Sequence, residues 1–156
     1  MKTCIVYYSM SGNTEMVAEK IADYMDADTI KLVPKKEYPN KGFKKYFWGG
    51  KSAIMGDTPV LEKYDFSDDY DCIIFGSPIW ASNITPPLNT FIRDNLDKIK
   101  DKKLAIFVCQ SGSGANKAIK KLKEKLNITN QLILIDPKDK PKDENNELIK
   151  DFCKKI

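Results

Sequence analysis

The strongest constraint on the fold is a regular alternation of short apolar segments with amphipathic segments. Five apolar runs, most of them continuous, have the length of β-strands: Thr3–Tyr8, Thr29–Val33, Cys72–Phe75, Leu104–Cys109 and Leu132–Ile135. Apolar residues recur at helical spacing in the stretches 17–25, 88–96, 115–126 and 148–156. Strands that are apolar throughout are covered on both faces, and strands that alternate with helices form parallel sheets. This pattern predicts an α/β fold with a doubly wound, five-stranded parallel sheet.

Connection rules predict the order of these strands. Right-handed crossovers favour the order 2-1-3-4-5 with helices on both faces, which makes a three-layer α/β/α arrangement. The direction of winding changes between the first and third strands, so the loops that follow these two strands lie side by side. A length of 156 residues, of which 42% are hydrophobic, fits a single domain over residues 1–156.

One long segment interrupts the alternation. Residues 34–42 read as a loop, and the following Phe43–Met55 is aromatic, basic and interrupted by glycines. We expect a long excursion that contains a short or irregular helix. Its aromatic side chains could cover a bound ligand or pack into the core, and the sequence favours neither alternative.

The first polar loop lies directly between the first strand and the first helix. It consists of Ser9, Met10, Ser11, Gly12, Asn13 and Thr14. Free backbone N–H groups and the positive end of the helix dipole hold anions at such a position. A helix cap needs only one residue of this kind, so the run favours ligand binding over capping. The loop has no cation and no GxxxxGK or GxGxxG motif, which predicts a neutral cradle for one terminal phosphate.

Two further polar loops follow the third and fourth strands. The first has Trp80 at its tip with little hydrophobic shelter, which favours stacking on a ligand over a place in the core. Its predicted binding residues are Ser77, Pro78, Ile79, Trp80, Ala81, Ser82 and Asn83. The second contributes Gln110, Ser111, Gly112 and Gly114, and ligand binding and a simple helix start are equally compatible with it. A phosphate cradle beside an aromatic face suggests a flavin nucleotide.

These motifs resemble those of a known family. The stretch Tyr7–Thr14, followed by Ala18 and Ile21, is similar to the FMN-phosphate signature of flavodoxins, and Gly76–Trp80 resembles their second flavin loop. The resemblance extends over the whole chain in length and strand order. It implies noncovalently bound FMN with its phosphate in the first loop, its isoalloxazine beside Trp80 and its pyrimidine side along the loop 110–114.

Two features differ from the usual pattern of that family. Typical flavodoxins are acidic, whereas this chain has 26 Lys and Arg against 22 Asp and Glu, a net charge of +4. Many flavodoxins also stack a tyrosine from the loop after the fourth strand on the flavin, and residues 110–114 contain no tyrosine. The resemblance therefore does not predict which face docks redox partners or which residue covers the outer face of the flavin.

Composition excludes several other classes of protein. Histidine is absent, which removes Ser-His and Cys-His nucleophile pairs and the commonest metal ligand, so we expect no catalytic residue and no metal site. The four cysteines lack CxxC spacing, which favours buried reduced thiols. No nucleic-acid recognition motif accompanies the basic charge. Without a leader after Met1 or an apolar stretch of membrane-spanning length, we expect a cytoplasmic protein with no membrane partner.

The function that these features favour is that of an electron carrier. FMN supplies the redox chemistry in such a protein, so no acid or base is needed. The alternative is an FMN-dependent NAD(P)H or quinone reductase, because Gly76–Ile79 and Phe43–Trp48 also resemble parts of that superfamily. Redox partner proteins are expected, and they are acidic if a lysine cluster steers them. This cluster comprises Lys35, Lys36, Lys41, Lys44, Lys45 and Lys51. A solvated surface is the simpler explanation of these lysines. The oligomeric state expected for the chain is a monomer or a homodimer.

Overall fold

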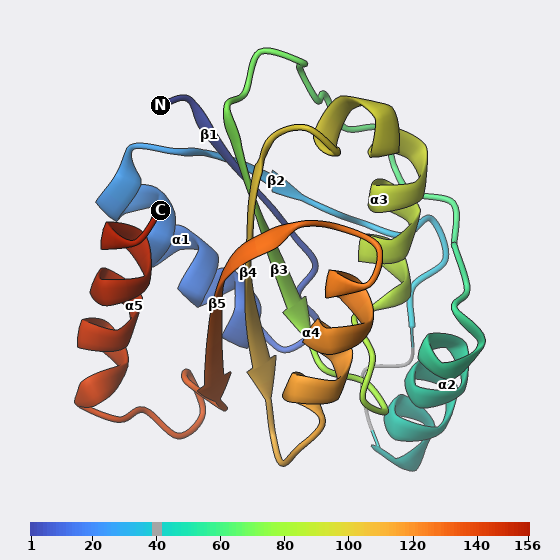
Figure 1. Ribbon diagram of the computed structural model, residues 1–156. Coiled ribbons are helices and arrows are strands. Elements are labelled where there is room, and N and C mark those ends of the chain that lie inside the picture. The colour runs from blue at the N-terminus through green and yellow to red at the C-terminus, as the bar shows by residue number, and fades with distance from the viewer. Residues whose placement is uncertain (39–41) are drawn as a thin grey trace.

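The computed structural model describes the backbone of residues 1–38 and 42–156 and the side chains of residues 1–38 and 49–156. Five parallel strands form one sheet in the order β2-β1-β3-β4-β5 (Figure 1). The elements are β1 (Thr3–Tyr7), α1 (Asn13–Met25), β2 (Asp28–Lys31), α2 (Gly42–Met55), β3 (Cys72–Pro78), α3 (Pro86–Ile99), β4 (Lys103–Gln110), α4 (Ala115–Lys123), β5 (Ile128–Ile135) and α5 (Glu144–Lys154). This topology confirms the predicted fold class and strand order.

The core lies on both faces of the sheet because successive side chains of each strand point in opposite directions. Val6 of β1 packs in one buried cluster with Leu88 of α3 and Ile119 of α4. The next residue along the strand packs in a second cluster on the opposite face, together with Ile21 of α1. Figure 1 shows the same division, with α1 and α5 on one side of the sheet and α3 and α4 on the other.

Strand boundaries differ from the prediction mainly at the two edges of the sheet. β2 covers Asp28–Lys31 instead of Thr29–Val33, and most of its residues are exposed. β5 begins at Ile128, four residues before the predicted start, because its first half is a polar edge segment that contains Thr129, Asn130 and Gln131. An edge strand faces solvent on part of its surface and needs no continuous apolar run.

The predicted irregular helix in the long excursion is wrong. α2 is a regular helix of 14 residues, and Gly49 and Gly50 lie inside it without breaking it. A Cβ atom added to Gly49 would lie 3.1 Å from Cε3 of Trp80, so this glycine allows the helix to approach the loop after β3. The side chains of Phe43, Phe47 and Trp48 lie outside the described residues, and their role stays a prediction.

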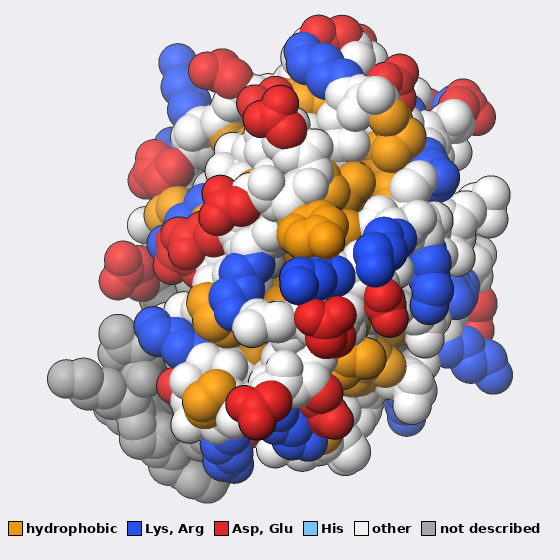
Figure 2. All heavy atoms as spheres, turned by 90° about the vertical axis from the view of Figure 1, so that its left-hand side faces the viewer, with side chains coloured by type: hydrophobic (Ala, Val, Ile, Leu, Met, Phe, Trp, Pro, Cys, Tyr) orange, Lys and Arg blue, Asp and Glu red, His pale blue; other side chains and the backbone are white. Residues whose placement is uncertain are grey.

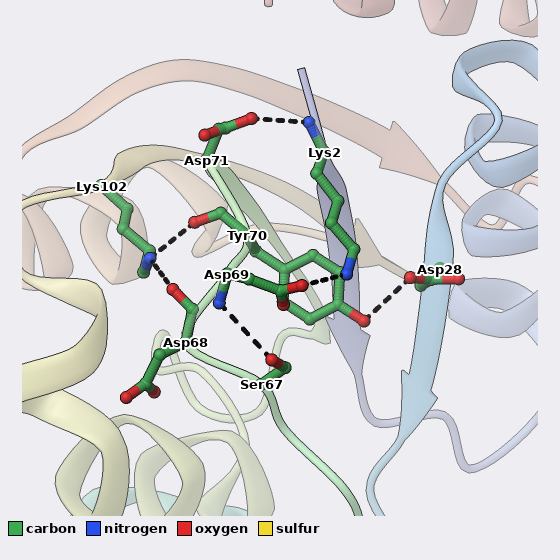
Figure 3. Close-up of polar contacts among 8 residues, drawn as sticks. All are labelled: Lys2, Asp28, Ser67, Asp68, Asp69, Tyr70, Asp71 and Lys102. Atoms are coloured by element: carbon green, nitrogen blue, oxygen red, sulfur yellow. Dashed lines mark hydrogen bonds and ion pairs between the residues drawn. The ribbon is translucent and has the colours of Figure 1, made fainter.

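Polar side chains connect the segments at the amino ends of the strands (Figure 3). The Lys2 backbone N–H donates to Asp71 Oδ2 at 2.7 Å, and the Tyr70 hydroxyl donates to Asp28 Oδ2 at 2.9 Å. Lys102 Nζ donates to the backbone carbonyl oxygens of Asp68 and Tyr70, both at 2.6 Å. These contacts join β1, β2 and the segment before β3 at the edge opposite to the predicted ligand loops.

The thiols are buried as expected, and one face of the molecule carries charges of both signs. Lysine and acidic side chains are interspersed on the side of α1 and α5, which faces the viewer in Figure 2. All four cysteines are buried free thiols, and burial raises the pKa of Cys4 to about 12 and that of Cys72 to about 11. Among the helices of the described residues, none is long and apolar enough to cross a membrane.

Candidate functional site

The loops after β1, β3 and β4 meet at the carboxyl edge of the sheet and enclose a cavity of about 190 Å³. Most of the predicted site residues line it: Met10, Ser11, Asn13, Thr14, Pro78, Ile79, Trp80, Ala81, Gln110, Ser111 and Gly112. The remaining wall consists of Gly50, Cys109, Ser113 and Asp136, which were not among the predicted binding residues. The tertiary structure therefore brings all three predicted loops to one site.

The loop after β1 owes its shape to Ser9 and Gly12. Ser9 Oγ accepts hydrogen bonds from the backbone N–H groups of Gly12 and Glu15, both at 3.2 Å. Gly12 has a φ of +90°, a left-handed conformation that glycine adopts without strain. Neither residue lines the cavity, and the Ser9 hydroxyl holds the loop closed, so its contact with the phosphate stays a prediction. Its capping role, which the sequence placed second, is the one that the structure shows.

The Thr14 hydroxyl is the group in the cavity that best fits an oxygen of a bound ligand. This residue is 1% exposed and lines the cavity. Its hydroxyl adjoins the Cys109 thiol, but no described residue makes a hydrogen bond of normal geometry to Thr14 Oγ1. A buried hydroxyl without a partner is costly in a folded protein, at about 1 to 3 kcal/mol. A ligand oxygen at the amino end of α1 would satisfy it, which fits the predicted phosphate position.

A cation from a distant segment approaches the same loop. Asn13 Oδ1 accepts a hydrogen bond from the Lys138 backbone N–H at 2.8 Å, and Asn13 Nδ2 donates to Asp139 Oδ2 at 2.6 Å. A Cβ atom added to Gly12 would lie 2.6 Å from Nζ of Lys138. The residues of the loop include no cation, as predicted, but the loop after β5 places an ammonium group against Gly12. Local sequence carries no signal for this contact, since 125 positions separate Asn13 from Lys138.

Trp80 lies in a different environment from the predicted one. Its ring contacts Tyr8 edge-on at a centroid distance of 5.7 Å and Tyr38 at 5.2 Å, and Gly49 of α2 lies against it. The expected lack of hydrophobic shelter is thus wrong, because residues remote in sequence supply the shelter. Trp80 nevertheless lines the cavity, so stacking on a ligand stays a prediction.

Four predicted residues support the loops from outside the cavity. Ser77 is fully buried, and its Oγ accepts from the Thr85 backbone N–H at 3.0 Å. Asn83 Nδ2 donates to the Ala81 carbonyl oxygen at 2.7 Å, and its Oδ1 accepts from Lys121 at 2.6 Å. Ser82 packs against Gly114, where an added Cβ atom would lie 2.7 Å from Ser82 Oγ. These four residues hold the loops that form the cavity wall, but they do not line the cavity themselves.

The loop after β4 combines the two roles that the sequence left open. Gln110 Oε1 accepts a hydrogen bond from the Ala115 backbone N–H at 2.9 Å, which caps α4, and the same residue lines the cavity. Ser111 Oγ donates to Asp136 Oδ1 at 2.7 Å. Burial raises the pKa of the neighbouring Cys109 thiol to about 12, so it is not a thiolate at neutral pH.

Comparison with known proteins identifies the family. The flavodoxin family model matches residues 2–138, which is most of the chain. This chain belongs to the flavodoxin family. The match agrees with the resemblance of the first two loops and supports the predicted cofactor, FMN.

Solved structures similar to this flavodoxin share its fold. A flavoprotein from Lactobacillus acidophilus NCFM, solved in complex with FMN, is 25% identical, with a TM-score of 0.73 over 88% of this chain and 95% of the other. A protein from Bacteroides eggerthii DSM 20697 is 22% identical, with a TM-score of 0.77 over 99% and 97% of the two chains. Oxidised flavodoxin 1 from Bacillus cereus is 23% identical, with a TM-score of 0.55 over 99% and 95%.

Proposed function

We propose that this flavodoxin binds FMN noncovalently at the carboxyl edge of its sheet and carries electrons between redox partner proteins. The observation that carries the proposal is the joint placement of three loops around one cavity, with the unsatisfied Thr14 hydroxyl at the amino end of α1. Membership of the family and the FMN complex of the Lactobacillus acidophilus protein support the choice of cofactor. FMN, when bound, supplies the redox chemistry.

The residues of the cavity wall are suited to different parts of FMN. Thr14 and Ser11 offer hydroxyl donors for the terminal phosphate at the start of α1, where the helix dipole also favours an anion. Trp80 and Ile79 offer apolar surface to the isoalloxazine. Gln110 and Ser111 border the cavity from β4 and its loop with polar groups for the pyrimidine edge. The protein thus binds and orients the cofactor, and its own side chains need no acid or base role.

The decisive experiment is reduction of the purified, FMN-loaded protein under anaerobic conditions. A carrier accepts electrons from a one-electron donor, and NADH or NADPH alone leaves its flavin absorbance unchanged. Steady consumption of NADH or NADPH with a quinone as acceptor would instead identify the reductase alternative. Failure of FMN to bind after removal and re-addition of flavin would contradict both functions and leave a binding module on this fold.

The proposed partners are proteins with an acidic docking face in the cytoplasm. Lys35 and Lys36 are exposed in the segment before α2, and Lys51 is exposed on α2 itself, which supports a basic approach to the site. Lys41, Lys44 and Lys45 of the predicted cluster lie outside the described side chains. Sedimentation of the FMN-loaded protein would distinguish a monomer from a homodimer.

A further inference from the structure

The loop after β5 contains two acids and two lysines close to the phosphate loop. Asp136 Oδ2 lies 3.1 Å from Nζ of Lys140, and Asp136 Oδ1 accepts a hydrogen bond from Ser111. Asp139 Oδ2 accepts a hydrogen bond from Asn13. Lys138 has no ion-pair partner among the described residues, so its charge is not neutralised by a direct contact.

On the helix side, the acid in the first turn of α1 is also paired. Glu15 of α1 forms an ion pair of 2.6 Å with Lys31 of β2. The Lys138 ammonium is therefore the cation that remains unpaired in the described surroundings of the phosphate loop. Lys138 Nζ can approach the loop backbone this closely because residue 12 is a glycine; a Cβ atom at this position would occupy the space of Nζ.

The position of Lys138 is secured by its backbone and not by its side chain. Its N–H group donates to Asn13 Oδ1 at 2.8 Å, and the amide of the same asparagine holds Asp139 at 2.6 Å. Asn13 is buried at the start of α1, so these two hydrogen bonds fix the loop after β5 to the helix end that faces the predicted phosphate.

We propose that Lys138 is a specificity-determining residue that makes this flavodoxin prefer FMN to riboflavin by supplying positive charge to the terminal phosphate. The inference rests on the proposed binding of FMN and adds a charged group to an otherwise hydroxyl and amide cradle. A phosphate monoester carries a charge of about −1.5 to −2 at pH 7, whereas riboflavin has no phosphate. Charge-assisted hydrogen bonds are about twice as strong as neutral ones, so the ammonium group acts on FMN alone.

The test compares Lys138→Met with Lys142→Met as a matched control. Lys142 is an exposed lysine of the same loop whose ammonium lies 3.9 Å from Glu144, and, unlike those of Lys138, its atoms are not among the nearest to Gly12. Flavin-free protein is titrated with FMN and with riboflavin, and quenching of flavin fluorescence gives both dissociation constants. Thermal unfolding of the flavin-free variants shows that each is folded.

We expect Lys138→Met to raise the dissociation constant of FMN about tenfold, the usual effect of losing a hydrogen bond to a charged group, and to leave that of riboflavin within about twofold. Lys138→Arg, which keeps the charge, should retain most of the preference. Added salt should weaken FMN binding to the native protein more than to Lys138→Met, because screening acts on the removed charge. Lys142→Met should behave as the native protein in all these measurements.

Other outcomes would overturn the inference. Equal losses for FMN and riboflavin would show that Lys138 only supports the loop, and an unchanged dissociation constant for FMN would show that its charge is not used. Both results leave the proposed function standing, because the native protein still binds FMN. Failure of the native protein to bind either flavin would reject the proposed function itself.

Discussion

At the scale of single residues, a substitution at Thr14 should affect FMN affinity and the stability of the flavin-free protein differently. Replacing Thr14 by Val removes a buried hydroxyl that no described residue satisfies, so the flavin-free protein should be as stable as the native one or up to about 1 kcal/mol more stable. FMN binding should weaken by about 1.5 to 3 kcal/mol, and riboflavin binding much less, because only FMN brings the phosphate. Urea unfolding and flavin titration measure the two effects.

Thr90 provides the matched control for this substitution. Its Oγ1 donates to the Pro59 carbonyl oxygen at 2.8 Å, far from the cavity wall. Thr90→Val should therefore lower stability by about 1 kcal/mol and leave FMN binding unchanged. If Thr14→Val also lost stability and retained its affinity for FMN, the Thr14 hydroxyl would have no role in phosphate binding.

Trp80 allows a direct optical test of the cavity at the same scale. The chain contains two tryptophans, so the measurement is made in Trp48→Phe, where Trp80 is the remaining emitter. FMN should quench this emission strongly, because Trp80 lines the cavity and the isoalloxazine is an aromatic acceptor. Emission that FMN leaves unchanged would place the flavin ring away from Trp80.

At the scale of elements, the close approach of α2 to the loop after β3 depends on one of two adjacent glycines. An added Cβ atom would lie 3.1 Å from Trp80 at Gly49 but 3.8 Å from the Ala81 Cβ atom at Gly50, which is an ordinary contact. Alanine is favoured over glycine in a helix by about 0.5 to 1 kcal/mol. Gly50→Ala should therefore stabilise the protein by about that amount.

The same substitution at Gly49 should have the opposite sign. Gly49→Ala presses a methyl group against the Trp80 ring, which Tyr8 and Tyr38 hold from other directions. We expect a loss of about 1 kcal/mol or more in the free energy of unfolding and a shift in Trp80 emission. Urea unfolding of the two variants side by side decides the prediction, and equal stabilisation by both would show that α2 does not pack on Trp80.

At the scale of the whole molecule, net charge is one of the two features in which this chain departs from the pattern of typical flavodoxins. The net charge of +4 predicts that an acidic partner approaches the site faster than an acidic flavodoxin would allow. Lys35→Glu combined with Lys36→Glu should lower the association rate with such a partner and leave FMN affinity unchanged. Stopped-flow rates at low and moderate salt test this, because screening acts over about 8 Å at physiological ionic strength.

A solvated surface predicts the contrary result. Association rates that respond neither to salt nor to the double charge reversal would remove the steering role of Lys35 and Lys36. Reversal of two surface lysines outside the site, Lys98 and Lys100, serves as the control, since they pair with Asp68 and Asp97 at the amino side of the sheet.

Strand order and the three loops of the site could be predicted from the amino-acid sequence alone. Both follow from local patterns, namely continuous apolar runs, helical stripes and the chirality of crossovers, and these hold over segments of ten to twenty residues. The polar first half of β5 was missed because an edge strand need not be apolar, and α2 was misjudged because its glycines serve a contact outside the helix.

The surroundings of the predicted ligand loops could not be predicted from the sequence and follow from the tertiary structure. It placed Lys138 against Gly12, Asp136 beside Ser111, and Tyr38 against Trp80. It also directed the Ser9 hydroxyl toward a backbone N–H group of its own loop. Each of the first three pairs joins segments that are remote in sequence, and no local propensity encodes such a contact. Packing of the whole sheet brings these segments together, because parallel strands deliver all their following loops to one edge.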